Sequence, residues 1–189
     1  MAEPLVAMLA AGRSTRFGGI KLEAACAGKP LGRWAVEAAE SAGLGPGVIV
    51  TGPERVSFAR GWTRLANPRP EDGLGTSLAI AASHALDTGH ETMIVMLADM
   101  PLVVPALLKV LAEAPAPMAF LYPRGGPGVP ALLDRRLITA AAGLTGDRGL
   151  GPMLRSVNAL PAGTMLFDVD TPEDLAEAER RLQGRLSGG

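Results

Sequence analysis

Short apolar runs alternate along this chain with longer segments in which apolar residues recur at helical spacing. Gly, Pro or Asp residues bound the short runs, as is common for buried strands, and the segments between them are mostly long enough for a helix. Strands and helices in alternation are typical of a parallel sheet with helices on its faces. We therefore expect one α/β/α domain.

The pattern predicts strands at residues 5–9, 48–51, 63–66, 92–97, 118–122, 129–133 and 164–167. It predicts helices at 31–42, 76–87, 105–113, 134–141, 149–157 and 171–183. The last helix has the clearest start, because Thr171 can cap it, Pro172 fits its first turn, and Glu173 and Asp174 favour the positive end of its dipole. We expect the domain to cover residues 1–185 and a frayed tail to follow at 186–189.

The charge balance argues against nonspecific binding to nucleic acid or to an anionic membrane. Lys and Arg total 18 residues and Asp and Glu total 19, so the chain has no net field that would attract a polyanion. Aromatic residues make up only 4% of the chain, and stacking platforms for single-stranded nucleic acid are therefore scarce. An anionic ligand must be held by local charges.

The cysteine content and the N-terminal run bear on the compartment. Cys26 is the single cysteine, which excludes an internal disulfide and fits a reducing environment. The apolar run at residues 5–11 lacks a basic leader and is too short for a signal peptide, and no apolar segment approaches the ~20 residues that span a bilayer. We expect a cytoplasmic protein with no membrane partner.

The loop after the first predicted strand is the strongest candidate for a ligand site. Glycines, small hydroxyl residues and three cations, Arg13, Arg16 and Lys21, follow the apolar run within a few positions. Backbone N–H groups and cations that converge in this way can bind phosphate, although a solvated turn with scattered charge is the alternative. The loop matches neither the P-loop nor the dinucleotide-binding motif GxGxxG.

Carboxylates follow two further predicted strands. Asp99 comes directly after a buried run, where an unpaired carboxylate is costly unless a cation such as Mg²⁺ meets it. Asp168 and Asp170 flank Val169, so they would point to opposite faces if the strand continues, and only one would reach a shared metal. Helix capping is the alternative role for Asp99, and capping or a surface pair is the alternative for Asp168 and Asp170.

Two glycine-containing loops also lead into predicted helices. In the loop at residues 67–78, which begins with Asn67 and contains Gly73, Thr76 or Ser77 can either cap the helix or donate a hydrogen bond to a base or a sugar. In the turn at residues 145–149, we favour Asp147 as a helix cap.

Five segments, taken together and in this order, resemble the MobA-like nucleotidyltransferases, and within them most closely the molybdenum cofactor cytidylyltransferases. The resemblance extends over about residues 5–182, nearly the whole chain. The segments are Leu9-Ala10-Ala11-Gly12-Arg13-Ser14-Thr15-Arg16-Phe17-Gly18 with Lys21, Asn67-Pro68 with residues 73–78, Leu97-Ala98-Asp99-Met100-Pro101, Gly146-Asp147-Arg148-Gly149, and Asp168-Val169-Asp170-Thr171-Pro172-Glu173-Asp174-Leu175.

The resemblance implies a Rossmann-like three-layer fold with a mostly parallel sheet and Mg²⁺-dependent transfer of a nucleoside monophosphate from an NTP to a small phosphorylated acceptor. It implies that Arg16, Lys21 and Asp99 are catalytic and that Asp99 and Asp170 bind the metal. It implies nucleotide contacts from Leu9, Ala10, Ala11, Gly12, Arg13, Asn67, Gly73, Thr76 and Ser77. A molybdoenzyme or its maturation factor is the implied protein partner.

Two details favour CTP over GTP. Guanylyl-transferring relatives usually have Gly in place of Ala11, and a Pro-Leu-Ala-Gly type segment in place of Thr76-Ser77-Leu78. The chain differs from the family pattern at two other positions. Gly128-Val129-Pro130 replaces a common Gly-His-Pro, and Gly151 stands where an Arg is frequent. A guanylyltransferase, a sugar-phosphate nucleotidyltransferase and a noncatalytic nucleotide-binding module therefore stay open as alternatives.

Overall fold

The computed structural model describes residues 3–12, 17, 20–54, 56–123 and 125–187. Its centre is a seven-stranded mixed sheet in the order β5-β4-β1-β6-β8-β7-β9. The strands are β1 (Leu5–Ala10), β4 (Val48–Thr51), β5 (Thr63–Ala66), β6 (Thr92–Leu97), β7 (Met118–Leu121), β8 (Pro127–Asp134) and β9 (Asn158–Pro161). Only β8 runs against its neighbours, so the expectation of a mostly parallel sheet is confirmed.

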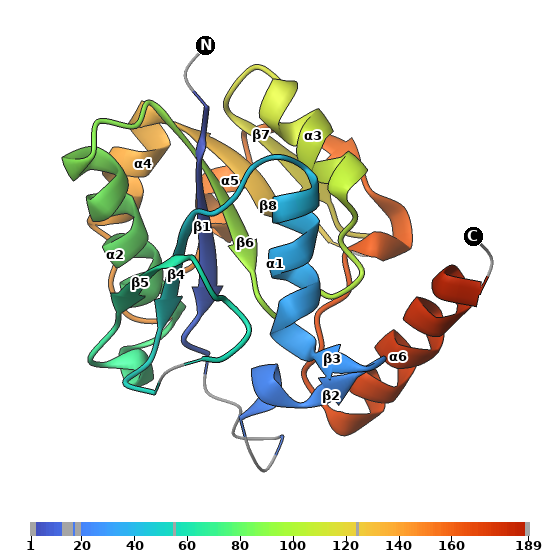
Figure 1. The fold of residues 1–189 in the computed structure, drawn as a ribbon. Coiled ribbons are helices and arrows are strands. Elements are labelled where there is room, and N and C mark those ends of the chain that lie inside the picture. Colours follow the sequence, from blue (N-terminus) through green and yellow to red (C-terminus); the bar gives the residue numbers. More distant parts are fainter. Residues whose placement is uncertain (1–2, 13–16, 18–19, 55, 124, 188–189) are drawn as a thin grey trace.

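Helices cover both faces of this sheet (Figure 1). Alternate residues of β1 show why: Val6 and Met8 belong to one apolar core, whereas Ala7 and Leu9 belong to another. The first core includes residues of α1 (Leu31–Ser41), α3 (Pro105–Glu113) and α6 (Pro172–Ser187). The second includes residues of α2 (Leu74–Asp87), α4 (Arg135–Ala142) and α5 (Gly151–Leu154). The expected α/β/α layering is therefore confirmed.

The remaining elements are short. A small hairpin, β2 (Ala25–Cys26) with β3 (Lys29–Pro30), pairs outside the main sheet. Three 3-10 turns, η1 (Lys21–Glu23), η2 (Pro70–Asp72) and η3 (Gly163–Met165), complete the described elements. The sequence pattern predicts none of these.

The prediction for the region after α4 is wrong in two places. The helix expected at 149–157 is the single turn α5, and the strand expected at 164–167 is a 3-10 turn followed by unpaired chain. The paired strand is instead β9, which lies at the sheet edge and ends at Pro161. A proline is tolerated at an edge because no further strand needs its missing N–H group.

The boundaries of three other helices, α2, α4 and α6, differ slightly from the expected ones or add detail to them. Helix α2 begins at Leu74 rather than at Thr76, and Asp134 caps α4 by accepting a hydrogen bond from the Leu137 N–H group at 2.8 Å. Helix α6 extends to Ser187, two residues into the segment expected to fray. That the whole chain folds as one unit remains a prediction.

Candidate active site

The candidate site lies where β1 and β6 end. Strand β1 sits between β4 and β6, and the chain passes from β1 to β4 on one side before it returns to β6 on the other. Sheets of this kind bind ligands at such a switch point, outside the carboxyl ends of the strands. The Ala98 N–H group still donates to the Leu9 carbonyl at 3.0 Å, so the loops that begin at Ala11 and Asp99 leave the sheet side by side.

Lys21 joins this edge of the sheet to the segment before α6. Its ammonium Nζ lies 2.8 Å from Asp99 Oδ2 and 3.3 Å from Asp170 Oδ1, and it donates to the Val169 carbonyl at 2.5 Å. Lys21 is 9% exposed, although it carries a charge. The buried charge is tolerable because these partners replace water around it. The structure thus brings together three residues that the sequence proposed for the site.

Local hydrogen bonds hold Asp170 at the cluster. The Asp174 N–H group donates to Thr171 Oγ1 at 3.1 Å, and Asp174 Oδ2 accepts from the backbone N–H groups of Asp170 at 3.1 Å and Thr171 at 2.9 Å. This reciprocal arrangement is a capping box, and it confirms Thr171 as the cap of α6. The Val169 N–H group donates to the Asp99 carbonyl at 3.0 Å, which fixes this segment beside the end of β6.

One oxygen of Asp99 has unused bonding capacity. Asp99 Oδ1 is buried and forms no hydrogen bond with any residue that the structure describes. A buried carboxylate oxygen without a partner is costly, so it fits a cation that arrives with substrate. No group of three or more His, Cys, Asp or Glu residues arranged for a metal occurs among the described residues. Mg²⁺ commonly uses one or two carboxylates plus substrate phosphates, and Asp99 with Asp170 fits that pattern.

Asp168 contacts Tyr122, a residue that the sequence reasoning missed. The segment around Val169 is not a strand, so the expected alternation of Asp168 and Asp170 does not apply. Asp170 faces Lys21, whereas Asp168 Oδ1 accepts from the Tyr122 hydroxyl at 3.3 Å. Tyr122 follows β7, whose carboxyl end lies at the same sheet edge as those of β1 and β6. That position is the signal that could have found it.

Burial and neighbouring charge change the proton affinity of this pair. Burial raises the pKa of Asp168 to about 6, and the negative charge of Asp99 adds to the effect, while the Tyr122 hydrogen bond opposes it. Burial and the nearby Asp168 carboxylate also raise the pKa of Tyr122 well above its usual range. Tyr122 therefore acts as a neutral hydrogen-bond donor at neutral pH.

A pocket of about 210 Å³ lies next to the first loop. It brings together four of the predicted nucleotide-binding residues, Ala11, Gly12, Gly73 and Ser77, with Pro70, Glu71, Leu74 and Asp147. Leu9 and Ala10 lie in β1 and are almost fully buried, at 5% and 8% exposure. Arg13 and Arg16, the other predicted residues of the loop, lie outside the described residues.

Asn67 and Thr76 support this pocket from inside the protein. The Asn67 side-chain amide donates to Thr76 Oγ1 at 3.0 Å and to Ser77 Oγ at 2.9 Å, and its Oδ1 accepts from the Arg69 N–H group. Asn67 is only 1% exposed. The Thr76 hydroxyl donates to the Gly73 carbonyl at 2.7 Å. Helix α2 begins at Leu74 and its N-cap is Gly73, so neither Thr76 nor Ser77 caps it. These bonds fix the start of α2 beside the loop.

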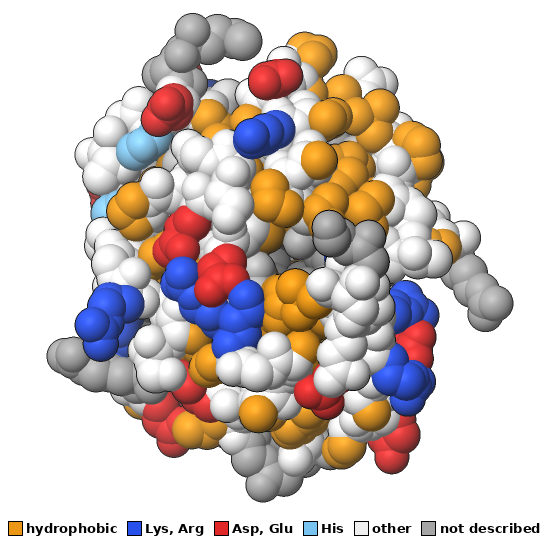
Figure 2. All heavy atoms as spheres, turned by 45° about the vertical axis from the view of Figure 1, so that its right-hand side comes forward, with side chains coloured by type: hydrophobic (Ala, Val, Ile, Leu, Met, Phe, Trp, Pro, Cys, Tyr) orange, Lys and Arg blue, Asp and Glu red, His pale blue; other side chains and the backbone are white. Residues whose placement is uncertain are grey.

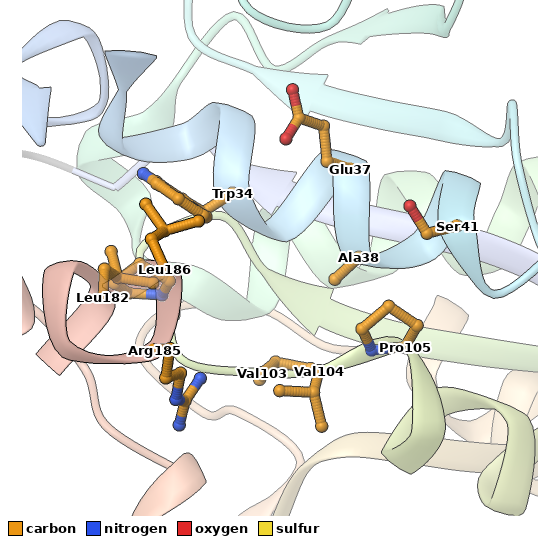
Figure 3. Close-up of a pocket in the computed structure, with 11 residues that line it drawn as sticks. Trp34, Glu37, Ala38, Ser41, Val103, Val104, Pro105, Leu182, Arg185 and Leu186 are labelled. Carbon is orange, nitrogen blue, oxygen red and sulfur yellow. The ribbon is translucent and has the colours of Figure 1, made fainter. Parts of the chain in front are cut away.

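A larger cavity of about 850 Å³ adjoins the site through Tyr122. Tyr122, Phe167 and Leu166 line it, with the glycine-rich turn before β8 and with Arg181, whose guanidinium lies 4.9 Å from the centroid of the Phe167 ring. A separate groove between α1 and α6 is lined mainly by apolar side chains, among them Trp34, Val104 and Leu186 (Figure 3). That groove contains none of the predicted site residues.

The surface agrees with the balanced composition. Arg33 pairs with Glu37 and Glu40, and Arg180 and Arg181 pair with Glu177. On the face in Figure 2, Lys and Arg side chains lie beside Asp and Glu side chains rather than in one basic patch. Among the helices that the structure describes, none is long and apolar enough to cross a membrane.

Solved structures share this fold over nearly the whole chain. Rv0371c from Mycobacterium tuberculosis is 25% identical and superposes with a TM-score of 0.76, covering 96% of this chain and 98% of its own. A second structure of that protein, a complex with manganese, gives a TM-score of 0.78 at 23% identity, covering 95% of this chain and 99% of its own. CMP:2-keto-3-deoxy-manno-octonic acid synthetase complexed with CTP, at 15% identity, gives 0.73 and covers 97% and 100%.

Comparisons of the amino-acid sequence identify the family. The purine catabolism protein PucB of Bacillus subtilis is 28% identical over 195 residues, which cover 92% of this chain and 95% of that protein. The model of the MobA-like NTP transferase domain matches residues 6–161, and these include Lys21, Asp99 and the pocket beside the first loop. The chain therefore belongs to the MobA-like NTP transferase family.

Proposed function

We propose that this nucleotidyltransferase is a molybdenum cofactor cytidylyltransferase, which moves CMP from CTP to the phosphate of molybdopterin and releases pyrophosphate. One observation carries the catalytic part of the proposal. Lys21 bridges Asp99 and Asp170 at the switch point of the sheet, and the second oxygen of Asp99 is buried without a hydrogen bond among the described residues. A noncatalytic nucleotide-binding module has little need for two carboxylates at this point.

The proposed metal is Mg²⁺, held by Asp99 and Asp170 together with phosphate oxygens of the substrate. When bound, it offsets the charge of the triphosphate and polarises the phosphoryl group that is transferred. The manganese complex of Rv0371c supports a divalent cation in this fold. Lys21 is buried beside both carboxylates, where its charge also stabilises an incoming phosphate. Arg16 is proposed to contact the triphosphate as well.

The pocket of about 210 Å³ beside Ala11 and Gly12 is the proposed site for the base and sugar, and Arg13 is proposed to lie at its edge. Asn67 and Thr76 would then act by positioning Gly73 and Ser77, because their side chains bond within the protein. The choice of CTP depends on Ala11 and on Thr76-Ser77-Leu78, the positions at which guanylyl-transferring relatives usually differ. A fold relative solved with CTP supports it further.

The proposed reaction needs positioning and charge stabilisation rather than a covalent nucleophile. An oxygen of the acceptor phosphate attacks the α-phosphorus of CTP in line. A new phosphorus–oxygen bond forms as the bond between the α-phosphorus and the bridging oxygen breaks, and that oxygen leaves with its electron pair on pyrophosphate. Lys21 and Arg16 stabilise the charge that develops on the leaving group.

The cavity of about 850 Å³ is the proposed acceptor site, since Tyr122 connects it to Asp168. Tyr122 and Phe167 offer two aromatic rings, and among the described residues of the turn before β8, Gly125 and Gly126 add lining without side chains. A flat heterocycle with one anionic group fits this lining better than a sugar phosphate, whose hydroxyl groups need several polar partners. This lining favours a pterin over a sugar as acceptor.

Thermal unfolding of the purified protein with Mg²⁺ and each of CTP, GTP, ATP and UTP tests the nucleotide, because a ligand that binds only the folded state raises the midpoint. A shift with CTP, followed by pyrophosphate release when molybdopterin is added, supports the proposal. A shift with GTP alone would identify a guanylyltransferase. Pyrophosphate release with a sugar phosphate but not with molybdopterin would identify a different acceptor, and no shift with any nucleotide favours a noncatalytic module.

A further inference from the structure

Asp147 lies in the wall of the proposed nucleotide pocket rather than at a helix start. The sequence favours Asp147 as a cap, but α5 begins only at Gly151, its N-cap is Leu150, and no side chain caps it. The Asp147 side chain instead lines the pocket with Ala11, Gly12 and Ser77. Asp147 is exposed, so its carboxylate is accessible to a ligand that enters the pocket.

Two glycines bring the turn of Asp147 against the start of α2. The Gly75 N–H group donates to the Gly146 carbonyl at 2.9 Å. A Cβ atom on Gly75 would lie 2.7 Å from that same oxygen, and a Cβ atom on Gly73 would lie only 2.3 Å from Asp147 Oδ1. The Asp147 carboxylate therefore lies close against the backbone of Gly73, where any larger residue would collide with it.

The charged side chains that line this pocket, among the described residues, are both acidic. Among the described residues that line it, Glu71 and Asp147 carry carboxylates, Ser77 carries a hydroxyl, and none is Lys or Arg. Carboxylates accept hydrogen bonds and repel phosphate. In the proposed function, a nucleotide would place its base here and direct its triphosphate toward Lys21, and the group of the base that meets Asp147 would be a hydrogen-bond donor.

We propose that Asp147 accepts a hydrogen bond from the exocyclic amino group of the base and so selects an amino base over its oxo counterpart. This inference rests on the proposed function, because it assumes that an NTP binds in this pocket. Cytosine and uracil have nearly the same shape, but cytosine has an amino group at position 4 where uracil has a carbonyl oxygen. A carbonyl oxygen facing Asp147 loses the bond and adds repulsion, so CTP binds more tightly than UTP.

Asp147→Asn is the direct test, because an amide has the same shape as a carboxylate but can donate as well as accept. Asp72→Asn is the matched control: Asp72 is in the neighbouring turn η2, it does not line the pocket, and the substitution removes the same charge. Dissociation constants for CTP and UTP with Mg²⁺ are measured by calorimetry for the wild type and both variants. We expect Asp147→Asn to reduce the preference for CTP by about 10- to 100-fold, the range for a hydrogen bond to a charged group, and Asp72→Asn to leave it unchanged.

Four other results would overturn the inference. If Asp147→Asn weakens CTP and UTP by the same factor, Asp147 contacts the ribose or supports the fold. If the wild type binds both nucleotides equally, the pocket does not read the base. If the wild type binds no nucleotide, the proposed function fails together with the inference. A protein that binds GTP alone is tested with the same variants on GTP and ITP, whose base lacks the 2-amino group, and an unchanged ratio there also overturns it.

Discussion

Lys21 Nζ lies 2.8 Å from Asp99 Oδ2 across 78 positions of sequence. The two side chains are 11% and 21% exposed, so much of the charge on each is shielded from water. A partly buried pair of this kind is costly to break from one side, because the remaining charge keeps its desolvation penalty and loses its partner. The pair therefore ties the chemistry of the site to the stability of the fold.

A double-mutant cycle on this pair measures the link. Lys21→Met leaves Asp99 partly buried without its ammonium, and we expect the free energy of unfolding to fall by about 1–3 kcal/mol. Asp99→Asn costs less, because Lys21 keeps the Val169 carbonyl and Asp170. The double variant is expected to lose less than the sum of the two, as measured by urea unfolding with EDTA present. Strict additivity would show that the two charges do not interact.

Asp99→Asn should separate binding from turnover. We expect pyrophosphate release to fall by at least about 10²-fold, because one of the two carboxylates proposed to hold Mg²⁺ is lost, while the CTP-dependent rise in melting temperature changes less. Glu91→Gln is the control. Glu91 is exposed and pairs with Arg135 at 3.0 Å, and neither residue belongs to the cluster around Lys21 or lines the two proposed substrate pockets. Undiminished turnover in Asp99→Asn would remove Asp99 from the mechanism.

Stability should depend on pH through Asp168. Its pKa is raised from 3.8 to about 6 in the folded protein, mainly by burial and by Asp99, so the folded state holds this proton more tightly than the unfolded chain. The resulting stability is present at about pH 4 and is lost as the pH rises through 6. Asp168→Asn stays neutral, so we expect it to be more stable than the wild type at pH 7.5 by about 1–3 kcal/mol, with little difference near pH 4.

Urea unfolding at several pH values in metal-free buffer gives the comparison for Asp168→Asn. Glu91→Gln again serves as the control, because Glu91 is exposed and lies outside the cluster. A difference between Asp168→Asn and the wild type that is the same at every pH would contradict the raised pKa.

Gly73→Ala tests the close approach of Asp147. Gly73 has a φ of +100°, and a Cβ atom there would also meet the backbone of Gly146 at 2.6 Å. Gly61→Ala is a matched control, because Gly61 has a φ of +88° but open space around its Cβ position. An alanine is strained at both positions, by about 1–3 kcal/mol, and Gly73, with a ψ of 176°, lies in a region that is essentially restricted to glycine. We expect Gly73→Ala to lose about 1–3 kcal/mol more in denaturant unfolding. Equal losses would show that the turn moves aside at little cost.

Cys26 should be inert in the folded protein. Its side chain is fully buried, and burial, helped by the negative charge of Glu179, raises the pKa of the thiol to about 11. The thiolate is the reactive form, so alkylation at pH 8 needs unfolding. We expect labelling by iodoacetamide, followed by mass spectrometry, to be slow in buffer and fast in denaturing urea. Rapid labelling of the folded protein would contradict this burial.

The local features of the chain were predictable from the sequence. The buried strands β1, β4 and β6 stand out as apolar runs that end in Gly, Pro or Asp, and the start of α6 is set by groups that lie within four positions of one another. The same local patterns failed at residues 149–167. An apolar run in this region does not reveal whether it can pair with the free edge of β7. In the structure, β9 pairs with that edge.

The site shows the same division. The sequence by itself determined which residue types follow which strands, and hence that Lys21, Asp99 and Asp170 were candidates for one anion and metal site. Only the tertiary structure decided that Lys21 bridges the two carboxylates, that Asp168 turns to Tyr122, and that Asp147 lies on Gly73. The residues in these hydrogen-bonded pairs lie between 46 and 149 positions apart in the sequence. Their geometry depends on the order and direction of strands in the sheet, which no local pattern contains.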